Sequence, residues 1–309
     1  MEGNPFSLKF NFEPGKVHQL QRNIRRIIAP NGSPMTFTGT NTYLVGNQNL
    51  AVIDPGPNIK AHLNSILASV TPNQSITHIL ITHSHIDHSP LAKILQEKTN
   101  APIYAFGDSF SGRSKMMMEL TKKGDLKGGE GLDKNFSPDV YVKDGDQISS
   151  DEWCFDAIWT PGHLGNHLCY GLKKSGVLFS ADHVMGWATS LVSPPDGDLT
   201  QFMDSLQKLL KFDDYNLYYP GHGDKIDNPK EIINYIIKHR KMREKQILKS
   251  IAEISLNSTQ IAEKIYIDVN KSLIPAAARN VFAHLIDLKQ RQLVTNSHEL
   301  NFETIFSSI

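Results

Sequence analysis

The sequence predicts an α/β protein in which strands of two facing sheets end at one shared rim, followed by a helical carboxyl-terminal segment. The apolar run at residues 76–82 has the composition of a buried strand, and a turn crowded with histidine follows it directly. Three later apolar runs likewise end at a histidine or an aspartate. Beyond residue 228 long helical patterns replace the strand-like runs.

The turn at residues 83–88 places three imidazoles and a carboxylate within a few residues of one another: His83, His85, Asp87 and His88. Ser89-Pro90 follows, and proline is favoured at the first position of a helix. Four such side chains have no packing role on a tight turn between a strand and a helix, so the pattern indicates a metal site. Imidazole and carboxylate without thiolate suit zinc, iron or manganese.

Three further places have the same local pattern. The runs at 155–160, 176–180 and 217–219 lead into turns that carry His163, Asp182 and His222. Each turn contains glycine, proline or alanine, which lets the backbone approach a neighbour closely. Two sheets whose strand ends share a rim would bring all four places together.

These residues make the sequence similar to the metallo-β-lactamase-fold hydrolases. The family's His-x-His-x-Asp-His motif matches residues 83–88, and its later ligands match His163, Asp182 and His222 in order. The resemblance runs from about residue 25 to residue 227 and includes segments 37–45 and 52–56. One departure is Ala181, where many relatives have glycine before the aspartate, but no ligand is lost.

Within the family, the sequence is most similar to the β-lactamase-like protein 2 group. The shared traits are the Tyr-Pro-Gly-His-Gly turn at 219–223, the helix with His239, Arg240 and Arg243, and the carboxyl-terminal extension. The resemblance implies a four-layer αββα catalytic domain at residues 1–227 and a winged-helix-like domain at residues 228–309.

Seven candidate ligands are too many for one tetrahedral ion and fit two ions with a shared bridging group. The resemblance implies that His83, His85 and His163 hold the first ion. It places Asp87, His88 and His222 on the second ion, with Asp182 bridging. A water between two divalent ions loses its proton near neutral pH, so we expect a bridging hydroxide as nucleophile, with Asp87 and Asp182 as catalytic carboxylates. Zinc is the expected metal, and iron or manganese would suit the same ligands.

Composition is that of a folded enzyme without a strong electrostatic preference. The chain has 309 residues, 39% of them hydrophobic, and no formal net charge. Cys154 and Cys169 lie in strand-like runs and are expected to be buried thiols rather than a disulfide. No apolar run has the length of a membrane span, and the amino terminus has no secretory pattern. We therefore expect a cytoplasmic protein, or one in another reducing compartment, without a membrane partner or a secreted β-lactamase role.

Two segments are candidates for shaping the substrate site. The loop at 185–198 follows Asp182, so Trp187, Thr189 and Ser190 are candidate substrate-binding residues, although Trp187 could equally be a core aromatic. Residues 107–137 are either a solvated insertion, glycine-rich and mobile in its second half, or a flap over the metal rim. By resemblance, Arg240 lies on the active-site side, where it could clamp a phosphate or carboxylate. His167 is expected to support the site rather than bind metal, and His183 is ambiguous.

The remaining pattern predicts a hairpin at 140–148 and a carboxyl-terminal module of helices and a wing. The helices are expected at 229–254, 258–265 and 274–288, and the wing at 293–295 and 301–305. Winged-helix modules bind nucleic acid in some proteins and form packing or homodimer surfaces in others. The helix at 274–288 carries one arginine and no lysine cluster, which favours packing.

Three functions are consistent with these residues. A hydrolase of a small ester, thioester or lactone needs only the two-metal centre and a pocket for the substrate. A single-strand endoribonuclease, which the group resemblance implies, needs a basic path and stacking aromatics. A non-catalytic metal-binding protein is the third, and the full ligand set argues against it.

Overall fold

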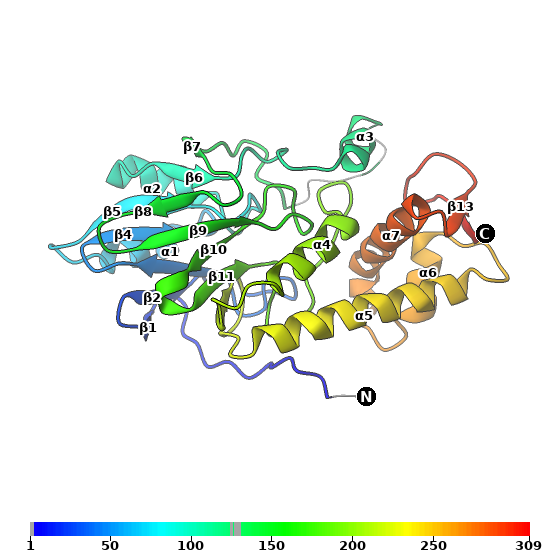
Figure 1. Cartoon of the computed structure of the whole chain (residues 1–309), viewed down its shortest axis with the longest axis horizontal. Helices are drawn as coiled ribbons and strands as arrows, with labels where there is room; N and C mark the ends of the chain where they lie inside the picture. Colours follow the sequence, from blue (N-terminus) through cyan, green and yellow to red (C-terminus); the bar gives the residue numbers. More distant parts are fainter. Residues whose placement is uncertain (1–2, 124–125, 127–130) are drawn as a thin grey trace.

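Two β-sheets pack face to face in this computed structural model, which describes residues 3–123, 126 and 131–309 (Figure 1). The first sheet has seven strands in chain order, antiparallel up to β4 and parallel from β4 to β7. Its strands are β1 (Val17–Gln21), β2 (Ile24–Ile28), β3 (Asn41–Val45), β4 (Asn49–Ile53), β5 (Ser75–Leu80), β6 (Ile103–Ala105) and β7 (Val140–Tyr141).

The second sheet has five strands in the order β12-β11-β10-β9-β8. They are β8 (Gln147–Ser149), β9 (Cys154–Trp159), β10 (Leu168–Leu172), β11 (Val177–Ala181) and β12 (Leu217–Pro220). β10 is antiparallel to both β9 and β11, and β11 is parallel to β12. β9, β11 and β12 therefore run in the same direction, and their carboxyl ends meet at one edge.

Helices cover the outer face of each sheet, which makes four layers. α1 (Lys60–Ala68) and α2 (Leu91–Thr99) pack their apolar faces on the first sheet. α4 (Leu199–Leu209) and α5 (Pro229–Ser250) do the same on the second. A third apolar cluster, with Tyr43, Phe155 and Phe179, fills the space between the sheets. The expected αββα fold is confirmed.

The hairpin expected at 140–148 is wrong. β7 pairs with β6 in the first sheet, whereas β8 pairs with β9 in the second, so the chain crosses between the sheets here. The Asp-Gly residues form a local turn, in which the Asp146 N–H donates to the Lys143 carbonyl at 3.1 Å, and this turn bonds to β9 through the Gly145 N–H, which donates to the Ala157 carbonyl at 2.8 Å. Val142 and Ile148 are both buried in the core between the sheets, which favours the crossing.

The carboxyl-terminal module contains α6 (Ser258–Ile265), α7 (Ile274–Gln290) and a two-stranded wing of β13 (Val294–Asn296) and β14 (Phe306–Ser308). Short 3-10 helices at Lys173–Ser175 and Lys271–Leu273 complete the described elements. The second wing strand begins later than expected. Residues 301–304 form a turn instead, in which the Thr304 hydroxyl accepts from the Asn301 N–H at 2.9 Å.

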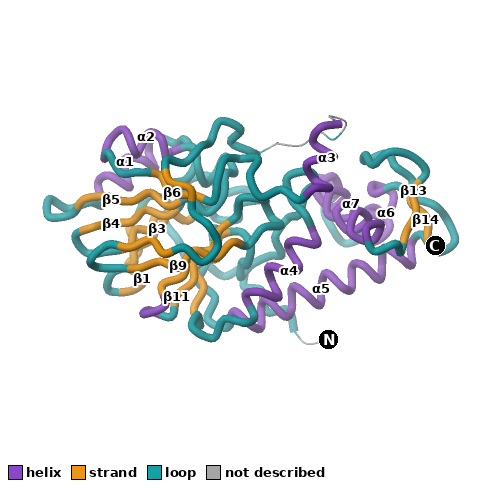
Figure 2. The backbone as a smooth tube through the Cα atoms, turned by 45° about the horizontal axis from the view of Figure 1, so that its top comes forward, coloured by secondary structure: helices purple, strands orange, loops and turns teal. Residues whose placement is uncertain are grey.

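α5 is shared by the two parts of the molecule. Ile232, Ile233 and Ile236 pack on the second sheet, whereas Ile247 packs in the carboxyl-terminal cluster with Phe282. Figures 1 and 2 show α5 running from beside α4 to the carboxyl-terminal helices. A domain boundary at 227/228 therefore falls just before an element that both parts use.

α3 (Lys115–Lys123) lies in the segment expected to be an insertion. Its Met117 and Leu120 are only 2% and 4% exposed and pack in the same cluster as Phe282 of α7. A solvated insertion is therefore wrong for α3, because its apolar face is buried against the carboxyl-terminal module. Residues 124–125 and 127–130, in the glycine-rich stretch expected to be mobile, lie outside the described residues. In the part of the chain that the structure describes, no helix is long and apolar enough to cross a membrane.

Candidate metal centre

The predicted ligands gather at the rim where the strands of both sheets end. His83, His85, Asp87 and His88 follow β5 of the first sheet. The others follow strands of the second sheet: His163 after β9, Asp182 after β11 and His222 after β12. Parallel strands end on the same side of a sheet, so the repeated strand-end pattern becomes one site in space.

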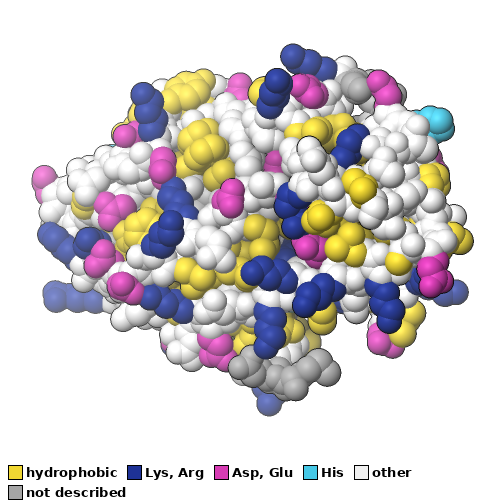
Figure 3. Space-filling view, turned by 45° about the vertical axis from the view of Figure 1, so that its right-hand side comes forward, with side chains coloured by type: hydrophobic (Ala, Val, Ile, Leu, Met, Phe, Trp, Pro, Cys, Tyr) yellow, Lys and Arg dark blue, Asp and Glu magenta, His cyan; other side chains and the backbone are white. Residues whose placement is uncertain are grey.

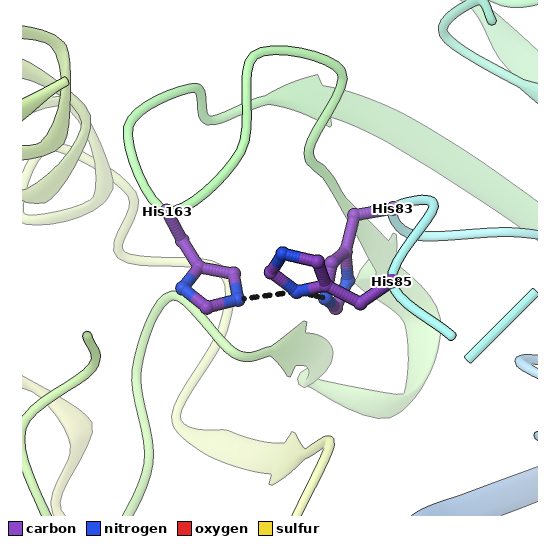
Figure 4. A group of neighbouring side chains, drawn as sticks. All are labelled: His83, His85 and His163. Atoms are coloured by element: carbon purple, nitrogen blue, oxygen red, sulfur yellow. Dashed lines mark hydrogen bonds between the residues drawn. The ribbon is translucent and has the colours of Figure 1, made fainter. Parts of the chain in front are cut away.

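His83, His85 and His163 form a compact group of imidazoles (Figure 4). Nδ1 of His85 lies 3.0 Å from Nε2 of His83 and 3.0 Å from Nε2 of His163. His83 and His163 come from different sheets and point toward the same space as His85. Three convergent imidazole nitrogens are a donor set that zinc and other divalent transition metals accept.

Asp87, His88 and His222 form a second group beside the first. Oδ2 of Asp87 lies 3.3 Å from Nε2 of His88 and 3.2 Å from Nε2 of His222. The buried Thr40 donates its hydroxyl to the same carboxylate oxygen at 3.0 Å, which fixes the orientation of Asp87.

Asp182 lies between the two groups. Its Oδ2 is within 4 Å of an Nε2 atom in four imidazoles, two from each group, at 3.9, 3.6, 3.6 and 3.3 Å for His83, His163, His88 and His222. Oδ1 of Asp182 and Nε2 of His88 are buried without a hydrogen-bond partner. Buried polar atoms without partners are costly in proteins, so a cation between these side chains would satisfy them. The residues therefore fit two divalent ions.

The pKa values of the imidazoles also differ between the two ligand groups. Burial lowers the pKa of His85 to about 3, and the neighbouring His163 acts in the same direction. Burial would also lower the pKa of His222, but the carboxylates of Asp182 and Asp87 outweigh it and raise that pKa to about 10. Burial opposes ionisation of Asp182, yet the charges of His222 and His88 hold its pKa well below the usual range. Without a cation, the carboxylates therefore hold protons on the imidazoles of the second group.

The outer ring nitrogens of the imidazoles are also held by the protein. His163 donates from Nδ1 to the Leu191 carbonyl at 2.8 Å, and His222 does so to the Gly39 carbonyl at 3.2 Å. Nδ1 of His88 lies 2.9 Å from Oδ2 of Asp54. Such contacts fix the tautomer and the orientation of a metal-binding imidazole.

The sequence analysis missed the role of Asp54. Its carboxylate accepts hydrogen bonds from the Thr82 N–H at 2.8 Å and the Thr82 hydroxyl at 2.6 Å in addition to its contact with His88. Asp54 directly follows β4 and has φ of 48°, so it sits in the same strand-end position as the ligands. That shared position before Pro55-Gly56 was the available signal.

The expected substrate-binding residues separate into two pairs. Trp187 and Thr189 are half-buried on the loop after Asp182, and the Trp187 ring stacks on Phe37 with centroids 4.9 Å apart. A β-carbon at Gly223 would lie 3.0 Å from Cδ1 of Trp187, which places the indole beside the His222 turn.

Ser190 and Arg240 have different surroundings from those expected. Arg240 is 3% exposed, and its guanidinium donates to the Ser190 carbonyl and to Oδ1 of Asn280. Ser190 is buried, with Oγ 3.0 Å from Nδ1 of His163. A clamp on a substrate phosphate or carboxylate by Arg240 does not fit this structure, because the guanidinium is buried and its two terminal nitrogens bond to a loop carbonyl and to Asn280.

His167 and His183 lie behind the ligands. His167 is fully buried, 2.9 Å from the Thr160 hydroxyl through Nδ1, and its ring centroid lies 5.1 Å from that of His83. His183 packs against Phe202 at 4.6 Å between ring centroids. Burial lowers the pKa of both imidazoles, that of His183 to about 3. Neither belongs to the groups that could hold a metal among the described residues.

A family model described as metallo-beta-lactamase superfamily matches residues 35–222, and one described as beta-lactamase associated winged helix domain matches residues 258–300. The chain therefore belongs to the metallo-β-lactamase superfamily and carries its associated winged-helix domain. The winged-helix expectation is thereby confirmed.

The chain is 32% identical over 302 residues to the beta-lactamase-like protein 2 homolog of Caenorhabditis elegans, covering 94% of this chain and 92% of the relative. This confirms the expected group. It is 26% identical over 258 residues to an Aspergillus fumigatus protein named atrochrysone carboxyl ACP thioesterase, covering 80% and 71% of the two chains. A crystal structure of a beta-lactamase domain protein from Burkholderia ambifaria has the same fold, with a TM-score of 0.79, 18% identity and 97% and 96% coverage.

Proposed function

We propose that this chain is a two-metal hydrolase of a small ester, thioester or lactone. The observation that carries the proposal is the position of Asp182, whose Oδ2 lies 3.6 Å from Nε2 of His163 in one group and 3.3 Å from Nε2 of His222 in the other. A carboxylate oxygen between two convergent ligand groups would suit two ions held side by side.

In this proposal each side chain has a separate role. His83, His85 and His163 would hold the first ion, Asp87, His88 and His222 would hold the second, and Asp182 would serve both. When bound, two divalent ions supply an activated water near neutral pH and polarise the bond under attack. The carboxylates of Asp87 and Asp182 would neutralise part of the positive charge of the ions. Zinc is the metal we propose first, because imidazole with carboxylate is its common donor set.

The surroundings of the site favour an acyl substrate with an apolar part. The stacked rings of Phe37 and Trp187 lie beside the His222 turn, and Ile86, within the histidine motif, is 52% exposed. Half-buried aromatic rings and an exposed apolar side chain beside a reactive centre offer contact area to an acyl group. Arg240 is not available to bind a phosphate, since it is buried and paired. The fungal relative named as a thioesterase supports the same substrate class.

Single-stranded RNA is the second candidate, and one surface feature favours it. Lys238, Lys241, Lys245 and Lys249 are all exposed on α5 at spacings of three and four residues, which places them along one side of the helix. Such a stripe could follow a phosphate backbone. Elsewhere the charge is mixed: Figure 3 shows basic and acidic side chains interspersed over the face that it views, and the net charge is zero.

Both cysteines are unpaired, which fits a reducing compartment such as the cytoplasm.

One comparison tests the proposal. The zinc-loaded protein is assayed against a panel of thioesters, lactones and aryl esters beside an unstructured RNA with a fluorescent reporter. We expect turnover of an acyl substrate that disappears on chelation and returns with added zinc. RNA cleavage with the same metal dependence, and no acyl turnover, would replace the first candidate by the second. No metal-dependent turnover of either class would contradict both.

A further inference from the structure

Three consecutive residues of the loop after β11 are each held by a different partner. The Ser190 carbonyl accepts from the guanidinium of Arg240. The Leu191 carbonyl accepts from Nδ1 of His163 at 2.8 Å. The Val192 N–H donates to Oδ1 of Asn280 at 3.1 Å. The loop thus connects a ligand of the first metal group to side chains of two carboxyl-terminal helices.

Arg240 and Asn280 form one unit behind this loop. Arg240 lies on α5 and Asn280 on α7, and Arg240 donates to Oδ1 of Asn280 at 3.0 Å. The guanidinium also lies over the Phe202 ring of α4, with Cζ 5.4 Å from the centroid. A buried guanidinium is desolvated, so its hydrogen bond to the Ser190 carbonyl of the loop is costly to lose.

The backbone that precedes His163 is fixed by α4. Gly162 has φ of 134°, and a β-carbon there would lie 2.3 Å from the backbone nitrogen of Phe202. The Asp198 N–H donates to the Gly162 carbonyl at 2.8 Å. α4 therefore holds the backbone next to His163, while the orientation of its ring depends on two groups of the loop, the Leu191 carbonyl and the Ser190 hydroxyl, which lie 2.8 Å and 3.0 Å from Nδ1.

We infer that Arg240 and Asn280 are positioning residues for His163, so that the carboxyl-terminal helices control the geometry of the first metal position. An imidazole whose Nδ1–H is held by a carbonyl presents Nε2 to the metal in one orientation. If the loop loses its anchors, the Leu191 carbonyl is free to move and the ring of His163 loses its fixed direction. Neither residue contacts the substrate in this role.

This inference rests on the proposed two-metal centre, and metal binding tests it without any substrate. Zinc affinity of the full-length protein is measured by competition with a chromophoric chelator, and the ligand field is followed by the visible spectrum of the cobalt-loaded protein. In Arg240→Met we expect one of the two equivalents to weaken by about 10–100-fold, as is usual when a group supporting a metal ligand is lost. The other equivalent keeps its parent affinity, and the cobalt spectrum changes.

Arg243→Met is the matched control. Arg243 is on the same helix, three residues later, and its guanidinium also lies over an aromatic ring, with Cζ 4.2 Å from the centroid of Tyr266. It bonds to Gln246 and to the Ile265 carbonyl, which are remote in sequence from the loop. We expect both zinc affinities and the cobalt spectrum of this variant to match the parent.

If Arg240→Met fails to fold, a second pair of variants tests whether the loop anchors position His163. Asn280→Leu removes the acceptor for Val192 and should weaken the same equivalent, whereas Asn280→Asp keeps an acceptor oxygen and should restore it. A parent that binds two ions while Arg240→Met or Asn280→Leu binds both with unchanged affinity and spectrum would overturn this inference alone. A parent that binds fewer than two ions would overturn the proposed function as well.

Discussion

A β-carbon on Gly221 would lie 2.2 Å from Oδ1 of Asp182. Two hydrogen bonds hold the Gly221 backbone in place beside the carboxylate. The Gly221 N–H donates to the Ala181 carbonyl at 2.9 Å, and the Gly221 carbonyl accepts from the Asn41 N–H at 2.7 Å. The same β-carbon would also lie 2.9 Å from Cε1 of His88. The absence of a side chain at this position is therefore a condition for the carboxylate that lies between the two ligand groups.

Gly221→Ala should consequently disturb metal binding more than folding. Displacing the Asp182 carboxylate should lower zinc affinity by at least about 10-fold, the lower end for a lost group that supports a metal ligand. Zinc competition and thermal unfolding of the metal-free protein measure the two effects. Gly3→Ala is the control, since nothing lies within 4 Å of a β-carbon there. If Gly221→Ala bound zinc like the parent, the close approach of the Gly221 backbone to the Asp182 carboxylate would not matter for metal binding.

Asp182→Ala should reduce turnover by at least ~10²-fold, the range for loss of a major electrostatic contact in catalysis. The fold should persist, because the residue lies on the rim rather than in a hydrophobic cluster. Steady-state kinetics and circular dichroism check the two parts. The exposed Asp151, replaced by alanine, should keep parent activity. Near-parent turnover without Asp182 would remove it from the mechanism.

Asp54→Asn tests the support of His88 with almost no change in volume. Oδ2 of Asp54 faces two donors, the Thr82 hydroxyl and Nδ1 of His88, and Oδ1 faces the Thr82 N–H. An amide would turn a donor toward one of them in either orientation. Zinc affinity or activity should fall by about 10–100-fold, as for other groups that orient metal-binding imidazoles.

The zinc titration described above measures this loss, and Asp151→Asn provides the matched charge change at an exposed position. If Asp54→Asn kept the affinity and turnover of the parent, the Asp54 carboxylate would have no part in orienting His88.

Replacing Lys241, Lys245 and Lys249 by alanine distinguishes the two substrate classes. If RNA binds along α5, each lost phosphate contact should reduce the salt slope of binding by ~0.7 for a single strand. Turnover of a small ester should stay at the parent value. Binding of a labelled RNA over a range of salt concentrations, beside ester kinetics, gives both readings.

A control triple variant removes the same charge from exposed lysines on other elements: Lys60, Lys98 and Lys174. Equal weakening of RNA binding by both triple variants would mean that the α5 stripe has no specific role.

Metal content provides the most direct check of the two ligand groups. Elemental analysis after gentle purification should approach two equivalents per chain, mostly zinc. Iron or manganese in place of zinc would leave the assignment intact, because these donors accept all three. An active protein that saturates with one ion would exclude the two-metal centre.

Much of the candidate site could be predicted from local sequence. The ligand residues stand directly after apolar runs, and strand period and turn composition are local properties that a single sequence displays. That the strand ends meet at one rim follows from how parallel strands are arranged in sheets. The order of helices and strands in the carboxyl-terminal module was visible for the same reason, apart from the late start of β14.

Other features depend on which residues, distant in sequence, pack against a side chain or strand, and only the tertiary structure shows them. From the sequence, Arg240 was expected to bind substrate beside the active site, but it is buried under the loop that holds His163. The Asp-Gly turn at 144–145 looks like a hairpin, yet its flanks pack into different sheets. The apolar face of α3 is visible in sequence, but its burial against α7 is not. Each outcome depends on contacts between residues far apart in the chain, whereas the ligand motif is determined by neighbours a few residues away.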